Sequence, residues 1–348
     1  AMTIGRETII WRRYAAAGED HTMAQEAKPG RDWKEAVSPD EAARHEAFAA
    51  LLASLQAKRS AKYGAGRALH RKGLLALSAS LEILPDLPDY CRAGLFAQPA
   101  AYEARVRLSN GGMDIQSNAR PDIRGFAISV RGVSGPGALG GDATRQDFLL
   151  INQDSFSSTT SAEFMTLVEA ASRSQAAVLF AMLRKFGLAG GLSRLRRLAG
   201  ALGKPFHGFA GERFNSVAPI SCGAYAVRVL LDPCAPHQRG AADPVDDMRA
   251  LLSDGPVVYD LKLQFYVDEA TTPIEDPTQV WPEDSAPIAT VARLTVFPEQ
   301  QAPAGFAAEV ERASFDPWAA LAEHRPLGEI MRARKVAYYA SQQARNAI

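Results

Sequence analysis

The 348-residue sequence predicts an α+β fold in which an eight-stranded antiparallel β-barrel or sandwich is flanked by helices. Eight segments alternate apolar residues with polar or small ones, which is the period of a half-buried strand. Regularly spaced helices do not separate these segments, so a helix-covered parallel sheet is disfavoured. The predicted strands span residues 75–83, 102–109, 124–131, 147–152, 222–231, 257–267, 287–296 and 306–314.

The remaining segments predict one domain with an N-terminal extension. Residues 1–39 are polar and are expected to form a partly ordered arm, and residues 40–348 form the single domain. A helix is predicted over 40–59, where apolar residues recur at helical intervals. A helical insertion follows over 161–203, and a last helix over 327–345 begins just after Pro326, a residue favoured at helix starts.

Composition excludes several classes of protein. The sequence has 39 Lys and Arg against 39 Asp and Glu, so it lacks the excess positive charge of a dedicated nucleic-acid binder. No run of about 18 apolar residues predicts a membrane span. The three cysteines are widely spaced and odd in number, which predicts neither a disulfide framework nor a cysteine zinc site. A cytoplasmic location is expected.

The helical insertion at 161–203 allows two interpretations. Residues 181–204 carry six basic and no acidic side chains, with leucines between them. A basic amphipathic helix can lie on an anionic membrane surface, so transient membrane contact is one interpretation. The other is a helical cover over the barrel with a solvated basic face.

The last predicted helix carries an unusual row of side chains. Arg334, Tyr338, Ser341 and Arg345 are spaced by four, three and four residues, so all four share one helix face. An anionic or metal-containing group could bind there, because a phenol binds iron as phenolate and a nearby arginine lowers the pKa of the phenol. A tyrosine is also one of the usual proximal ligands of haem. An exposed helix with a scattered Arg and Tyr is the alternative.

Six motifs in order carry a resemblance to a known family. The sequence is similar to the haem catalases and, most closely, to the shorter catalase-related haem peroxidases, over most of its length. That resemblance implies the catalase-type eight-stranded antiparallel barrel. The motifs are 67–73 (RALHRKG), 106–109 (VRLS), 122–127 (DIRGFA), 280–282 (VWP), 306–317 (FAAEVERASFDP) and 334–338 (RKVAY).

The resemblance implies a role for each matching residue. Tyr338 is implied as the axial ligand to the iron of haem b, with Arg334 as its partner. His70 is implied as the acid and base that acts on peroxide, and Ser109 as the residue that orients it. The remaining cofactor contacts are implied to come from Arg67, Arg107, Phe156 and Arg345, with Ser341 on the same helix face.

The sequence departs from the family where catalases have a distal asparagine that helps to bind peroxide. In the stretch 144–151, Arg145 falls at that place by counting, and Gln146 falls there after a slip of one residue. We therefore expect these two residues in the catalytic site and weak catalase activity.

The expected function is that of a peroxidase, or of an enzyme that transforms organic or lipid hydroperoxides. The substrates would be a peroxide and an unidentified apolar organic compound. A true catalase, and a protein that only binds or senses haem, are the alternatives. A homodimer stays open as the assembly.

Overall fold

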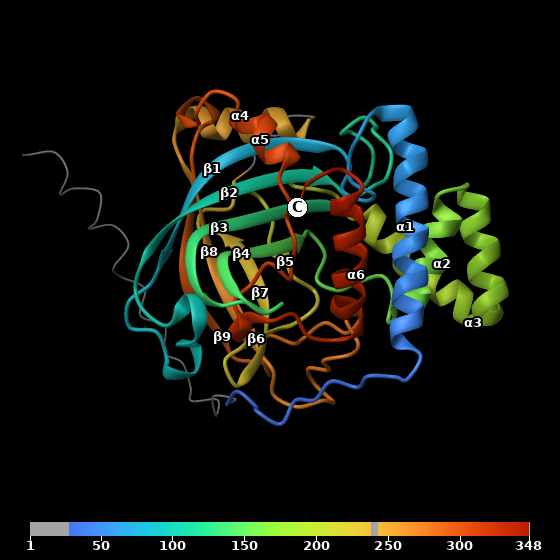
Figure 1. Ribbon diagram of the computed structural model, residues 1–348, viewed down its shortest axis with the longest axis horizontal. Coiled ribbons are helices and arrows are strands. Elements are labelled where there is room, and N and C mark those ends of the chain that lie inside the picture. The colour runs from blue at the N-terminus through green and yellow to red at the C-terminus, as the bar shows by residue number, and fades with distance from the viewer. Residues whose placement is uncertain (1–27, 238–242, 348) are drawn as a thin grey trace, which may run out of the picture.

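The computed structural model describes residues 28–237 and 243–347. The predicted arm over 1–39 therefore lies partly outside the described residues. Its described part forms no helix or strand and passes along the bottom of the barrel in Figure 1 before the first helix begins. Several hydrogen bonds fix it there. The Gly30 amide donates to the Tyr266 carbonyl (2.7 Å), for example, and Trp33 Nε1 donates to the Ala224 carbonyl (3.0 Å).

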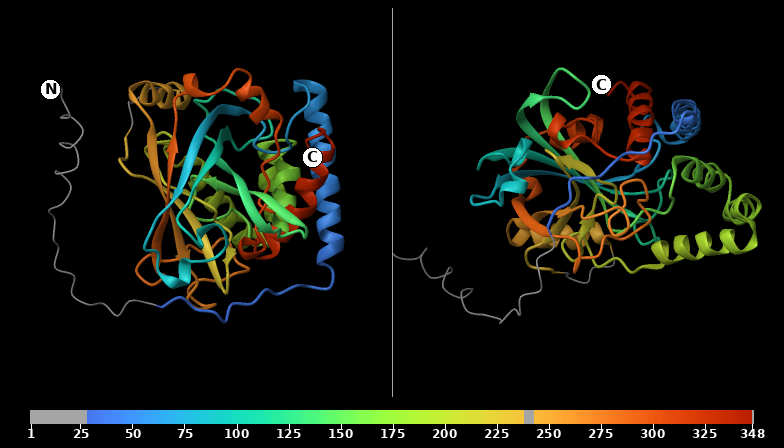
Figure 2. Two further views of the ribbon diagram at one scale, coloured as in Figure 1. Left: turned by 60° about the vertical axis from the view of Figure 1, so that its left-hand side comes forward. Right: turned by 90° about the horizontal axis from the view of Figure 1, so that it is seen from below.

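A closed barrel forms the centre of the molecule (Figures 1 and 2). Eight strands form a ring in the order β5-β4-β3-β2-β1-β9-β8-β7, and pairing between β5 and β7 closes it. Every pairing in the ring is antiparallel, and β6 adds to β7. The predicted eight-stranded antiparallel barrel is thus confirmed. The strands are β1 (Gly73–Ile83), β2 (Ala101–Asn110), β3 (Arg124–Pro136), β4 (Asp142–Ile151), β5 (Phe214–Asn215), β6 (Ile220–Cys222), β7 (Tyr225–Pro233), β8 (Val257–Phe265) and β9 (Ile288–Val296).

The barrel interior is a packed apolar core. Successive side chains of a strand point to opposite faces, so the alternate apolar residues of β1 all point inward. Leu77, Val106, Ile128, Leu261 and Leu294 come from five different strands and are fully buried in this core. Burial of this apolar surface is the main term that favours the closed ring.

One predicted strand is wrong. Residues 306–314 contain helix α5 (Phe306–Arg312), and the eighth strand of the ring is β5, which has two residues. Phe306 and Val310 are four residues apart and both buried, which is the spacing of one helix face. Gly305, with φ of 82°, precedes the helix in a left-handed conformation that favours glycine. A strand as short as β5 has no readable period.

The helices cover one side and the top of the barrel. α6 and α1 lie beside each other against the barrel, α2 and α3 lie beyond α1, and α4 and α5 lie at the top in Figure 1. Helices are therefore present over all three segments that predict them. Their bounds are α1 (Glu41–Tyr63), α2 (Ser161–Ala171), α3 (Gln175–Gly203), α4 (Pro244–Asp254), α5 (Phe306–Arg312) and α6 (Glu329–Gln343), with 3-10 helices at Asp89–Cys91, Gly94–Phe96, Glu299–Gln301 and Ala322–His324.

The insertion consists of two helices that begin at capping side chains. The Thr160 hydroxyl accepts from the Glu163 amide at the start of α2, and the Ser174 hydroxyl accepts from the Ala177 amide at the start of α3. Gly187 has a non-helical backbone, with φ of 71° and ψ of 178°, and divides α3 into two segments. In the part of the chain that the structure describes, α3 alone is long and apolar enough to cross a membrane, by length and composition only.

Candidate active site

A large cavity lies between the barrel and the helices α1, α2 and α6. Its volume is about 1340 Å³, counted with the open space at its mouth. Nine of the eleven site residues that the sequence predicts line this cavity, although they come from distant parts of the chain. They are Arg67, His70, Arg107, Ser109, Phe156, Arg334, Tyr338, Ser341 and Arg345.

Helix α6 supplies one wall of the cavity, and the residues that it places there include polar and small ones. Arg334 Nη2 donates to Tyr338 Oη at 2.8 Å, so a guanidinium lies against the phenol one helical turn away. A guanidinium at this position can hold the phenol oxygen by a charge-assisted hydrogen bond. The buried residues Ala333 and Ala337 line the cavity in the same turns. Their small side chains leave room beside the phenol.

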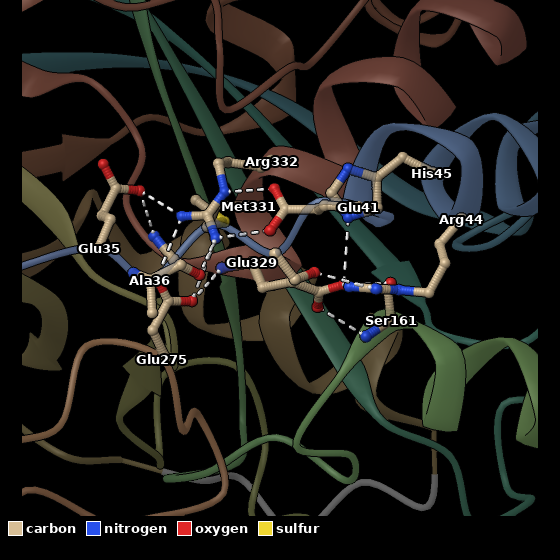
Figure 3. A network of polar contacts seen from close by, with 12 residues as sticks. Glu35, Ala36, Glu41, Arg44, His45, Ser161, Glu275, Glu329, Met331 and Arg332 are labelled. Carbon is tan, nitrogen blue, oxygen red and sulfur yellow. Dashed lines mark hydrogen bonds and ion pairs between the residues drawn. The ribbon is translucent and has the colours of Figure 1, made fainter.

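The start of α6 is fixed by a buried carboxylate (Figure 3). Glu329 lies 3.1 Å from His45 Nε2 on α1, and it accepts the amide of Ser161 at the start of α2 (2.7 Å). The Ser161 hydroxyl also donates to it. Glu329 therefore ties α6 to both neighbouring helices and sets the position of the helix that carries Tyr338.

A second set of ion pairs holds α6 on its outer side (Figure 3). Arg332 binds the carboxylates of Glu35 (2.6 Å), Glu41 (2.6 Å) and Glu275 (3.1 Å). These carboxylates come from the N-terminal arm, from α1 and from the loop before β9. The position of α6 is thus fixed from three directions.

His70 lies in the turn before β1, with a left-handed backbone (φ of 49°) that is uncommon for residues other than glycine. The His70 amide donates to the Gly111 carbonyl (3.0 Å), which holds this turn against the end of β2. The side chain Nδ1 lies 3.0 Å from Ser109 Oγ on β2. Nε2 has no hydrogen-bond partner among the described residues, and the ring lines the cavity.

Gly125 makes room for this imidazole. A Cβ at position 125 would lie 2.6 Å from His70 Nδ1 and 2.7 Å from Ser109 Oγ, closer than real Cβ contacts. Gly125 pairs with Ser109 in the sheet, so the two strands and the ring meet at one point. A glycine inside a strand often marks such a close approach, and this signal is present in the motif at 122–127.

The environment keeps His70 uncharged. Burial, together with the positive charges of Arg107, Arg334 and Arg67, lowers the pKa of His70 to about 3. The imidazole is therefore neutral at ordinary pH and can accept a proton at one nitrogen.

Three arginines meet at one end of the cavity, around the end of α5. Arg107 binds the Glu311 carboxylate through Nε (2.8 Å), and Arg67 binds it through Nη1 (2.7 Å). Arg345 Nη2 donates to the Ala313 carbonyl (2.9 Å), and its Nε is buried without a partner. Sequence reasoning missed the role of Glu311, because the contact joins segments about 200 to 240 positions apart.

Arg145 and Gln146, the two residues predicted at the distal position, are not among the residues that line the cavity. Arg145 donates to Ser314 Oγ (2.7 Å) and pairs with Asp147, while the Gln146 Oε1 accepts the Leu321 amide (3.0 Å). Both lie earlier on β4, opposite Arg131 and Val130 of β3. The register of β4 thus keeps them away from the cavity.

The part of β4 that reaches the cavity is aliphatic. Leu149, Leu150 and Ile151 line it. Ile151 pairs with Gly125, which in turn pairs with Ser109, so these three residues form one row across the sheet beside His70. This part of the cavity wall is therefore hydrocarbon.

The residues present fit a haem. The phenol of Tyr338, with Arg334 beside it, is one of the side chains that can hold haem iron. The arginines at the end of the cavity outnumber the carboxylate between them, and Arg345 Nε remains unpartnered there. Two propionates would satisfy such a cluster. Aromatic side chains, Phe48, Phe156 and Phe164, supply an apolar wall.

Comparison with solved structures identifies the fold. A bacterial catalase aligns with a TM-score of 0.61 and 17% sequence identity, and the alignment covers 81% of this chain and 57% of that catalase. Catalase A from Saccharomyces cerevisiae aligns with a TM-score of 0.59 and 17% identity, over 80% of this chain and 61% of that catalase. A fungal catalase aligns with a TM-score of 0.65 and 19% identity, over 100% of this chain and 70% of that catalase. No family model and no curated protein matches the sequence. The chain thus spans 57–70% of the length of these catalases. The chain has the catalase fold.

Proposed function

We propose that this protein is a haem-dependent enzyme that uses peroxides and acts on organic hydroperoxides in preference to disproportionating hydrogen peroxide. One observation carries the proposal: the His70–Ser109 and Tyr338–Arg334 pairs line a single cavity whose β4 wall is aliphatic. The catalase fold supports a peroxide-related activity. The hydrocarbon wall favours an organic substrate.

Haem b would be held by the phenolate of Tyr338, with its propionates on Arg67, Arg107 and Arg345. When bound, it would supply the redox chemistry that breaks an O–O bond. The protein's part is to hold the ligand in position through Arg334, to exclude water with the phenylalanine wall and to move a proton.

His70 is the group that moves the proton. If its Nδ1–H donates to Ser109 Oγ, the free Nε2 carries a lone pair that faces the cavity and can accept the hydroperoxide proton. The same nitrogen then returns the proton to the departing oxygen, which leaves as water or as an alcohol. Ser109 fixes the tautomer, and the lowered pKa of His70 keeps the lone pair available.

The weak disproportionation of hydrogen peroxide follows from the β4 wall. A second hydrogen peroxide molecule needs polar partners to be held beside the histidine. Leu149 and Ile151 offer none, whereas they can pack against the hydrocarbon part of an organic hydroperoxide. A true catalase and a protein that only binds haem remain the two alternatives to be separated by experiment.

Steady-state assays test the proposal. Purified haem-loaded protein is assayed with hydrogen peroxide, cumene hydroperoxide and a fatty-acid hydroperoxide, each with and without a phenolic electron donor. We expect a higher kcat/KM for the two organic hydroperoxides and slow oxygen evolution from hydrogen peroxide. Fast oxygen evolution would identify a catalase, and no turnover of any peroxide would support the haem-binding alternative.

A further inference from the structure

The exposed face of α3 gathers large apolar side chains. Nine large hydrophobic residues are exposed among the described residues, and four of them lie on this one helix. Phe180 is 68% exposed and Leu188 80%, with Leu179 and Leu192 also exposed. The other five are distributed over several separate elements. Single exposed hydrophobic residues are ordinary, whereas a group on one surface usually marks a binding site.

Basic side chains lie next to these apolar residues. Phe180 and Arg184 are four residues apart, so they are neighbours on one helix face. In the second segment of α3, Leu188, Leu192 and Arg196 follow each other at the same interval. The helix contains no Asp or Glu. Its outer surface therefore combines hydrocarbon and positive charge, without an acidic residue on the helix itself.

Not all of the basic residues are available for a partner. Lys185 Nζ donates to the Ala162 carbonyl and Thr166 Oγ1 of α2, and Arg194 pairs with Glu163 of α2 at 2.5 Å. These two residues hold α3 on α2. Arg184, Arg196 and Arg197 are exposed and make no ion pair or hydrogen bond from their side chains within the described residues. We call these three arginines, with Leu179, Phe180, Leu188 and Leu192, the α3 surface.

The geometry of α3 suits a position on a membrane better than a path across one. The non-helical backbone at Gly187 divides the helix, and the first segment of 12 residues is about 18 Å long, against the roughly 30 Å of a hydrocarbon core. The second segment contains three arginines. A divided helix with an apolar surface and adjacent arginines is typical of a helix that lies in the plane of the interface.

The position of α3 leaves this surface accessible. α3 packs on α2 at the edge of the molecule (Figures 1 and 2). Its C-terminal end returns toward the barrel, where the Ala201 carbonyl accepts from Gln153 Nε2. The buried side of α3 is already occupied, because Val178 and Met182 pack with Ala170 of α2. The residues of the α3 surface are exposed in this arrangement.

We propose that α3 docks on lipid bilayers that contain anionic phospholipids, with the α3 surface as the contact. Its arginines would pair with lipid phosphates while Phe180 and Leu188 enter the acyl-chain boundary. A second copy of the chain fits less well, because a two-fold contact would place like-charged arginines opposite each other with no acidic residue on the helix to offset them. The inference rests on α3 alone and does not depend on the proposed enzymatic activity.

The docked helix would lie close to the active site. Phe164 of α2 lines the cavity and packs edge-on against Phe48 of α1, while Glu163 of α2 holds Arg194 of α3. Adjacent residues of α2 thus contact the cavity and the membrane-binding helix. A bilayer would lie one helix layer from the cavity wall, near the source of apolar hydroperoxides.

Vesicle flotation of the full chain tests the proposal. The protein is mixed with phosphatidylglycerol vesicles or with phosphatidylcholine vesicles, at low and at high salt. We expect binding to phosphatidylglycerol that weakens at high salt, and much weaker binding to phosphatidylcholine. Absence of binding by the wild-type protein, or equal binding to both lipids, would overturn the proposal.

Two variants locate the contact. Arg184→Glu/Arg196→Glu/Arg197→Glu should weaken binding to phosphatidylglycerol by about 100-fold or more, since each basic residue near an anionic surface contributes to binding. Phe180→Ser/Leu188→Ser should weaken it by at least about tenfold. Both variants change exposed side chains only, and circular dichroism checks their fold.

Matched controls change basic and apolar residues elsewhere. Lys28→Glu/Lys34→Glu/Lys58→Glu alters the net charge equally, and Val37→Ser/Leu139→Ser removes two other exposed apolar side chains. Both controls should retain binding, and an equal loss in them would refute the assignment to α3. Sedimentation velocity without lipid should give one mass for all proteins. A dimer that is lost only in the α3 variants would show that the surface binds a second copy.

Discussion

Two walls of the same cavity differ in character. The α6 wall is polar and ordered, with Arg334 bonded to Tyr338, and its helix is anchored by Glu329 and Arg332. The β4 wall consists of Leu149, Leu150 and Ile151. In the proposed enzyme, the polar wall holds the haem, while His70 and Ser109 provide polar groups for the peroxide. Under this proposal, separate elements of the fold form the cofactor-binding side and the substrate side of one cavity.

The largest expected effect comes from the proton-transfer residue. His70→Ala should lower kcat/KM for every hydroperoxide by about 10²- to 10⁴-fold, because the cavity has no second neutral base beside Ser109 among its described lining residues. Haem content should be unchanged, since His70 belongs to the substrate side. A similar fall in haem content would show that the two walls are not independent.

A smaller effect is expected when the imidazole is displaced. Gly125→Ala places a Cβ 2.6 Å from His70 Nδ1, so the ring must move, and kcat/KM should fall about 10- to 100-fold. Gly200→Ala is the matched control, because a Cβ there meets nothing within 4 Å. An unchanged rate in Gly125→Ala would mean that the position of His70 is not important for turnover.

The pH dependence should distinguish this histidine from an ordinary one. With its pKa lowered to about 3, His70 stays neutral from pH 8 to pH 5, so kcat/KM should change little. With a histidine of the ordinary pKa of 6.5, kcat/KM would fall about 30-fold over that range.

The same pKa shift predicts how stability depends on pH. Between pH 6.5 and 3, His70 is protonated in the unfolded chain and neutral in the folded one, so the free energy of unfolding should fall as pH falls through that interval. A rate loss centred near pH 6.5 would contradict the low pKa.

An amide on the β4 wall should bring the substrate side closer to a catalase. Ile151→Asn places an amide in the row with Gly125 and Ser109, and the ratio of oxygen evolution to donor oxidation should rise about two- to tenfold. Arg145→Asn is the control and should leave the ratio unchanged, because that side chain points away from the cavity to Ser314. The opposite pattern would restore Arg145 as the distal residue.

The smallest expected effect concerns the anchor of α6. Glu329→Gln removes the charge that binds His45 and Ser161 and should lower the free energy of unfolding by about 1–3 kcal/mol, or Tm by roughly 2–10 °C. Glu169→Gln breaks only an exposed pair with Arg173 and should cost less than about 1 kcal/mol. Calorimetry of both variants decides whether the buried carboxylate stabilises the helix.

The sequence predicted the parts of this molecule that have a local period. The alternation in β1 and the four-residue spacing on α6 identify a strand and a helix face without tertiary information. Residues 306–314 were misassigned because Phe306 and Val310 also fit an apolar segment of a strand, and burial on α5 decides between the two. Arg145 was expected at the distal position by counting residues along β4, and a shift of one residue moves a side chain to the other face of the sheet.

Contacts between distant segments could not be predicted in this way. The ion pairs of Glu311 with Arg67 and Arg107, and the anchoring of α6 by Glu35 and Glu275, depend on how the barrel brings its ends together. On α3, the sequence grouped Arg194 with the other basic residues. The structure shows that Glu163 binds it, so its charge is not available to a partner.

The central claim is that Tyr338 holds the haem, and haem titration of the purified protein tests it most directly. The wild-type protein should bind one haem per chain, with tyrosinate modes in the resonance Raman spectrum of the ferric form. Tyr338→Phe should lose these modes and at least about tenfold in haem affinity, whereas Tyr339→Phe, which changes the exposed neighbouring phenol, should behave as wild type. Retention of the same modes and the same affinity in Tyr338→Phe would contradict the account.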